Sequence, residues 1–97
     1  MAEAPITVEC PEDQWTKVST GVKIAKLFAH PAFTLASYVY TYRPTGAAAP
    51  DQADRDIEGV PVFTAKKPIK PVNSEDAIDS YIWCENRDGK VILWTIE

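Results

Sequence analysis

The side chains that most often carry out chemistry in proteins are few in this 97-residue chain and lie apart in its sequence. The only histidine, His30, follows Ala29 and precedes Pro31, in what reads as a turn. No serine or cysteine near it in sequence suggests a nucleophile that a histidine would activate. We therefore expect His30 to face solvent or to cap the turn.

The two cysteines, Cys10 and Cys84, show no Cys-x-x-Cys spacing, and one histidine cannot complete a metal site with them. We expect no metal and no cofactor. The glycines stand singly, which excludes a glycine-rich phosphate loop. Without an export signal in the sequence, free thiols are favoured over a disulfide, although a disulfide stays open.

The carboxylates form one dense run, from Asp51 to Glu58, which reads as a solvated loop. Such a loop is a poor place to shift a carboxyl pKa by burial, so general acid–base catalysis is not expected and neither is an enzyme. A regulator that acts through Asp51, Asp54, Asp56 and Glu58 stays open as an alternative. The net charge of −4 argues against a nucleic-acid partner. No apolar run approaches the roughly 20 residues that span a bilayer, so no membrane partner is expected.

The aromatic residues are the feature that demands an explanation. In SYVYTYRPTGAAAP, which begins at Ser37, three tyrosines occupy alternate positions and therefore one face of a strand, predicted over Phe33–Tyr42. The opposite face carries Ser37, Val39 and Thr41, so both faces have something to bury. The chain is short, and it is open whether it supplies both covers itself.

Alternation also predicts the other elements. Strands are expected over Gln14–Thr20 and Val22–Ala29, separated by Gly21, with a helix over Val18–Phe28 as the weaker alternative. The segment VPVFTA reads as a short edge strand because of its inner proline. Ser74–Asp76 reads as a turn or a single helical turn.

The C-terminal segments AIDSYIWCE and KVILWTIE flank an Asp-Gly pair and predict a β-hairpin, with Gly89 in the left-handed conformation of a bulged turn. The fold class is therefore all-β, an antiparallel β-sandwich or small barrel with a C-terminal β-hairpin. We expect one domain over 14–97. Residues 1–13 are expected to form an N-terminal arm, either a flexible tail or a segment that reaches a neighbour.

Large rings on both faces of these strands define a candidate interface, made up of Tyr38, Tyr40, Tyr42, Tyr81, Trp83 and Trp94. The rings could lie in an ordinary core, against another subunit, or against a ligand. For a ligand, a carbohydrate stacked on Tyr38, Tyr40, Tyr42 or Trp83 is the alternative of another class.

The order QWTKVSTG, TGAAAP, IEGVPVF and AIDSYIWCENRDGKV resembles small virion structural proteins of tailed bacteriophages over roughly residues 14 to 93. This resemblance implies a β-sandwich that decorates a capsid or contributes to a fibre, collar, tail or baseplate. It implies a homo-oligomer, other virion proteins such as the major capsid protein as partners, and a location in the virion after synthesis in the bacterial cytoplasm. It carries over no functional residues.

Overall fold

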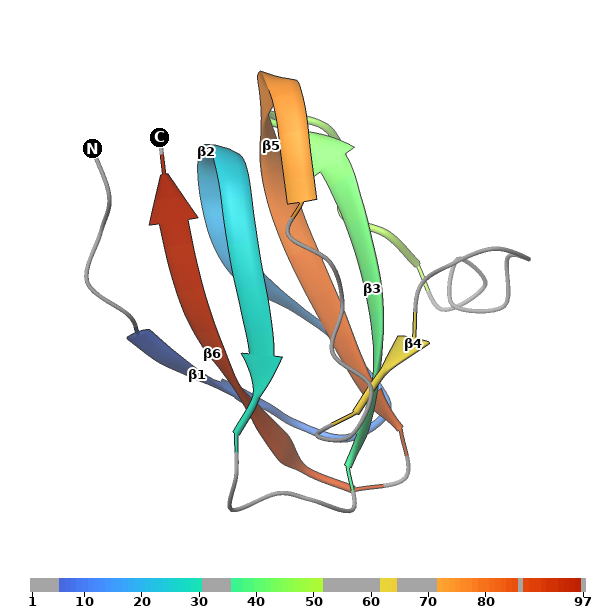
Figure 1. Cartoon of the computed structure of the whole chain (residues 1–97). Coiled ribbons are helices and arrows are strands. Elements are labelled where there is room, and N and C mark those ends of the chain that lie inside the picture. The colour runs from blue at the N-terminus through green and yellow to red at the C-terminus, as the bar shows by residue number, and fades with distance from the viewer. Residues whose placement is uncertain (1–5, 31–35, 52–61, 65–71, 86, 97) are drawn as a thin grey trace.

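Six antiparallel strands form one sheet in the computed structural model, which describes residues 6–30, 36–51, 62–64, 72–85 and 87–96 (Figure 1). The strands are β1 (Ile6–Cys10), β2 (Trp15–Ala29), β3 (Ser37–Pro44), β4 (Val62–Phe63), β5 (Val72–Glu85) and β6 (Gly89–Ile96). Their order across the sheet is β1-β6-β2-β5-β3-β4. The prediction of an all-β, antiparallel fold is confirmed.

The long strand β2 connects the two halves of this sheet. Its first part pairs with β5, from Trp15 opposite Trp83 to Val22 opposite Ile78, and its last part pairs with β6. Gly21, at φ 65°, lies in an irregular stretch where the register with β5 shifts. A bulge lets the strand bend without leaving the sheet. The prediction that Gly21 separates two strands is therefore wrong, and the weaker alternative of a helix over Val18–Phe28 is excluded as well.

The predicted C-terminal hairpin is also wrong, because β2 lies between β5 and β6 in the sheet (Figure 1). Both edges of β5 are already occupied at its C-terminal end. Trp83 pairs with Trp15 of β2 on one side, and Cys84 pairs with Tyr38 of β3 on the other. The chain must therefore cross to the far side of β2 before it can continue as β6. Gly89 does not have a positive φ, unlike Gly21 and Gly46.

Other boundaries differ from the predictions by smaller amounts. Ser74–Asp76 belongs to β5 and is not a turn. Residues 6–10 of the predicted arm form β1, which pairs with β6 and places Cys10 in the core. The short strand β4 lies at the edge of the sheet, as predicted. The start of the strand predicted from Phe33 and most of the acidic run lie outside the described residues.

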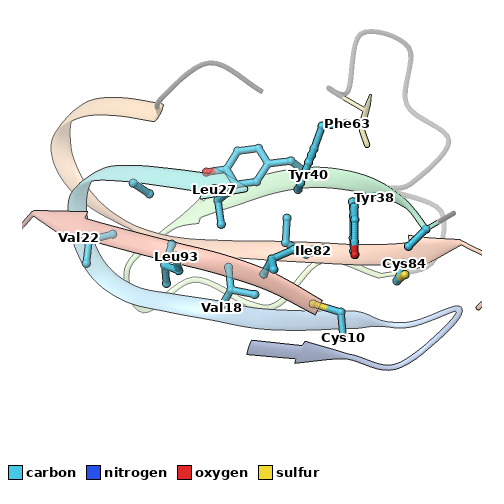
Figure 2. Close-up of a cluster of buried hydrophobic side chains, with 13 residues drawn as sticks. Cys10, Val18, Val22, Leu27, Tyr38, Tyr40, Phe63, Ile82, Cys84 and Leu93 are labelled. Atoms are coloured by element: carbon cyan, nitrogen blue, oxygen red, sulfur yellow. The ribbon is translucent and has the colours of Figure 1, made fainter. Parts of the chain in front are cut away.

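The inner face of the sheet encloses one hydrophobic core (Figure 2). Alternate residues of each strand enter it, among them Leu27 of β2, Tyr38 of β3, Ile82 of β5 and Leu93 of β6, each at most 2% exposed. The alternation is regular along β6, where Val91 and Leu93 are buried while Trp94 is exposed. A strand with this pattern has one face against the core and one against solvent.

Strand β5 differs from β6 because both of its faces are buried over its C-terminal half, from Ile78 to Cys84. Ile82 and Cys84 lie in the core, while Asp79, Tyr81 and Trp83, on the opposite face, are also at most 3% exposed. The sheet therefore has a second buried layer on its outer side, which other segments of the same chain cover.

Candidate interaction surface

Two of the six predicted interface rings lie in the core. Tyr38 is fully buried and stacks on Phe63, with ring centroids 5.0 Å apart. Its hydroxyl donates to the carbonyl of Lys90 over 2.8 Å and accepts from the Lys90 amide over 3.2 Å. These hydrogen bonds connect β3 to β6, which are not neighbours in the sheet. Burial raises the pKa of Tyr38 to about 12.

Tyr40, which is 3% exposed, forms a hydrogen bond of 2.9 Å with the Ser80 hydroxyl. Burial raises the pKa of Tyr40, although this hydrogen bond acts in the opposite direction. Tyr42 continues the row of tyrosines, tilted against Tyr40 at a centroid distance of 6.4 Å, but it is 51% exposed. The sequence correctly placed the three tyrosines on one face, and only the last extends beyond the core.

Two further rings, Tyr81 and Trp83, lie on the outer face of β5 and are covered by the chain itself. The Trp15 ring meets Trp83 edge to face at 5.6 Å. The Trp15 indole nitrogen donates to the Asp51 carbonyl over 2.7 Å, which holds the segment after β3 close to this layer. The Lys17 ammonium lies 5.8 Å from the centre of the Tyr81 ring, within the range of a cation–π contact.

A buried carboxylate fixes the same layer. Asp79 accepts hydrogen bonds from the Gly21 amide at 2.9 Å and from the Thr45 hydroxyl at 3.2 Å, and it pairs with Lys17 at 3.5 Å. Burial acts to raise the pKa of Asp79, but the two hydrogen bonds and the lysine outweigh it, so the pKa lies below its ordinary value of 3.8. Asp79 therefore connects the β2 bulge to the turn after β3.

The interface prediction is thus wrong for Tyr38, Tyr40, Tyr81 and Trp83, which the folded chain encloses by itself. The physical reason is that the chain supplies both covers: the curled sheet for one face, and Trp15 with the segment reaching Asp51 for the other. A carbohydrate platform on Tyr38, Tyr40 or Trp83 is excluded for the same reason, because stacking requires an accessible ring face.

Two exposed rings, those of Phe28 and Trp94, lie together on the outer face of β2 and β6. Phe28 and Trp94 are each 43% exposed, and Ile92 between them is half-buried. Phe28 lies directly opposite Ile92, and Trp94 lies opposite the exposed Lys26. We call Phe28, Ile92 and Trp94 the outer strip. Trp94 was among the predicted interface residues, and Phe28 was not.

The alternation of Val22–Ala29 contained a signal for Phe28, since Lys26 lies on the same face and marks it as the solvated one. Val22 and Leu27 are both buried, although a regular strand would place an even-numbered and an odd-numbered residue on opposite faces. The register shift between Val22 and Ile24 exchanges the two faces of the strand, and no sequence pattern announced it.

The thiols are poor nucleophiles in the folded chain. Cys10 and Cys84 are free and fully buried, so the expectation of free thiols is confirmed. Burial raises the pKa of Cys10 to about 12 and that of Cys84 to about 11, with smaller contributions from neighbouring negative charge. Both groups are therefore protonated at neutral pH, whereas the thiolate is the reactive form.

One hollow of about 280 Å³ opens beside Cys10, lined by Glu9, Cys10, Pro11, Asp88, Gly89 and Lys90. Its charged groups already have partners: Lys90 pairs with Glu9 at 3.7 Å, and Asp88 accepts from the Glu12 amide at 2.9 Å. Across the described ranges, no three His, Cys, Asp or Glu side chains gather where they could hold a metal ion. None of the described residues forms a helix with the length and apolarity needed to cross a bilayer.

Comparisons of the chain with protein-family models, with curated proteins and with solved structures give no match.

Proposed function

We propose that this chain is a non-enzymatic structural protein of a bacteriophage virion, which stabilises the capsid by decorating it through contacts between subunits. The observation that carries the proposal is the outer strip: Phe28 and Trp94, two large rings, stand 43% exposed on adjacent strands. The resemblance of the sequence to small virion proteins of tailed phages supports the same role.

The outer strip suits a contact surface. A Phe or Trp buries about 150–250 Å² when fully enclosed, so roughly 65–110 Å² of each ring is still available to a partner. At ~25 cal/mol per Å², covering both rings contributes about 3–5 kcal/mol before the costs of association are subtracted. The costs of association offset a single contact of this size, so the contact stabilises an assembly only when many subunits repeat it, as on a capsid lattice.

The strip also has a charged border. Lys26 lies opposite Trp94, and the Lys90–Glu9 pair lies one step beyond Ile92 on the same outer face. Apolar rings surrounded by polar groups are the usual composition of a protein–protein contact. We infer that the partner is another virion protein, such as the major capsid protein, or further copies of this chain.

The experiment that tests this role is mass-spectrometric identification of the chain in purified virions, with its copy number. We expect hundreds of copies per particle, the number for a capsid lattice. A handful of copies would instead place the chain in the tail, collar or fibre, and its absence from particles would contradict the proposal.

A second measurement tests the surface itself. Trp94→Ser should abolish incorporation into particles, whereas Tyr42→Ser, which removes a comparably exposed ring outside the strip, should leave incorporation unchanged. Equal incorporation of the two variants would show that the outer strip is not the contact.

A further inference from the structure

The two edges of the sheet differ in their protection against another strand. Strand β4 at one edge has only two residues. Strand β1 at the other edge has five residues in unbroken register with β6, from Ile6 opposite Leu93 to Cys10 opposite Gly89. Natural sheets protect an edge by very short strands, bulges, prolines or charged side chains, especially lysine. Strand β1, with the sequence ITVEC, has no bulge, proline or lysine, and its one charged side chain, Glu9, pairs with Lys90 of the neighbouring β6.

The free side of β1 is also accessible. Among the described residues, only β6 forms a ladder with β1. Ile6 is 53% exposed, and Thr7 and Glu9 are exposed as well. An edge of this kind offers unpaired backbone groups to a second strand.

The sequence of β1 complements itself. In an antiparallel pair centred on Val8, Ile6 of one chain faces Cys10 of the other, and Thr7 faces Glu9. Thr7 and Glu9 share the outer face, because their cross-strand partners in β6 are Ile92 and Lys90. No like charges then lie directly opposite each other, and Glu9 keeps its ion pair with Lys90.

We propose that two copies of this chain pair through β1, antiparallel and centred on Val8, to form one continuous sheet. The inference rests on the proposed role as a virion subunit and adds a partner and a register to it. A two-fold axis perpendicular to the sheet places both outer strips on the same side. The dimer therefore presents two contact surfaces to a lattice at once, which raises its avidity without any new contact.

Charge changes at Thr7 test the register. Thr7→Glu places a like charge opposite Glu9 of the partner at both symmetric positions, whereas Thr7→Lys places an opposite charge there. Cross-strand pairs contribute roughly 0.2–1 kcal/mol each, so Thr7→Glu should raise the dimer dissociation constant about 2- to 30-fold. Thr7→Lys should leave the constant unchanged or lower it by a similar factor.

The measurement is sedimentation equilibrium of the full chain over a wide concentration range, with near-UV circular dichroism to verify that each variant is folded. Thr20→Glu is the matched control, since Thr20 is an exposed threonine of β2. We expect a concentration-dependent dimer that Thr7→Glu weakens and Thr20→Glu does not. A monomer at every concentration overturns the proposal, and so does a dimer that Thr7→Glu and Thr20→Glu affect equally. Neither result depends on the copy number in virions, which tests the proposed function separately.

Discussion

Gly89 has the least room for a side chain among the glycines that the structure describes, and replacing it with alanine should destabilise the protein strongly. A Cβ at this position would lie 2.7 Å from Cys84 Sγ, from Tyr38 Cε1 and from the Tyr38 hydroxyl oxygen. Tyr38 and Cys84 are both fully buried, and the Tyr38 ring is held against Phe63. Neither contact can be relieved by a side chain turning into solvent.

The magnitude follows from these contacts. Overpacking of a core costs about 1–3 kcal/mol, and displacing the Tyr38 hydroxyl from Lys90 costs about 1 kcal/mol more. We therefore expect Gly89→Ala to lower the free energy of unfolding by about 2–4 kcal/mol. For a domain of this size, that loss corresponds to a fall in Tm of roughly 8–30 °C.

Urea unfolding followed by tryptophan fluorescence measures this loss, and Gly89→Asn distinguishes its causes. If Gly89 served a left-handed turn, asparagine would be tolerated better than alanine. Because space is the limit here, the larger asparagine should destabilise more than alanine. A double-mutant cycle with Cys84→Ala, which removes one of the close contacts, should recover part of the loss. A tolerated Gly89→Asn, or a Gly89→Ala loss below about 0.5 kcal/mol, would show that Tyr38 and Cys84 leave room for a side chain at this position.

Three further predictions concern the other buried groups and the outer strip. The pKa of Asp79 lies below 3.8 in the folded chain, so its stabilising contribution is present above the unfolded-state pKa and is lost as pH falls through the folded-state value. Asp79→Asn should therefore reduce the loss of stability at acid pH in unfolding measurements over a pH series. An unchanged loss at acid pH would exclude Asp79 as its source. The thiol pKa values of about 12 for Cys10 and about 11 for Cys84 exceed the ordinary 9.0, so the free energy of unfolding should fall as pH rises above 9.0. Alkylation of both thiols should be no faster than unfolding, because both are buried. Rapid alkylation at neutral pH would contradict their burial. Phe28→Ser and Trp94→Ser should each lower the free energy of unfolding of the isolated chain by about 2–4 kcal/mol, because the chain itself covers more than half of each ring; a loss below about 0.5 kcal/mol in urea unfolding would contradict this packing.

Local sequence patterns predicted the fold class but not how the strands pair. Alternation identified β3 and both C-terminal strands, because a period of two depends only on which side of a strand meets the core. The Asp-Gly pair before Lys90 predicted a hairpin, but pairing also depends on which edges are free. Both edges of β5 are taken by β2 and β3, so β6 pairs elsewhere. The glycine serves the packing of Tyr38 and not a turn.

The candidate site was predictable only in part. The sequence showed that the strand over Phe33–Tyr42 has something to bury on both faces, and consecutive residues of β3, Tyr38 and Val39, are indeed both buried. It could not show that Trp15 reaches Trp83 and Asp51, because both contacts join residues that lie far apart in the chain, 36 positions in the case of Asp51. Trp94 was among the predicted interface residues, whereas Phe28 was not, because the bulge that separates the faces of Val22 and Phe28 leaves no pattern in the sequence.

The place of β6 in the sheet has a consequence for the order of assembly. Strands β1 and β2 are consecutive in the chain, yet β6, the last to emerge during synthesis, inserts between them. Until β6 is synthesised, β1 and β2 lack the strand that pairs with both of them, and we expect an open slot at its place in the sheet. A chain that ends before Gly89 should accept a synthetic peptide of residues 89–96 in this slot, and recovery of native circular dichroism on adding that peptide would demonstrate complementation. No recovery at saturating peptide would show that the slot collapses before its strand arrives.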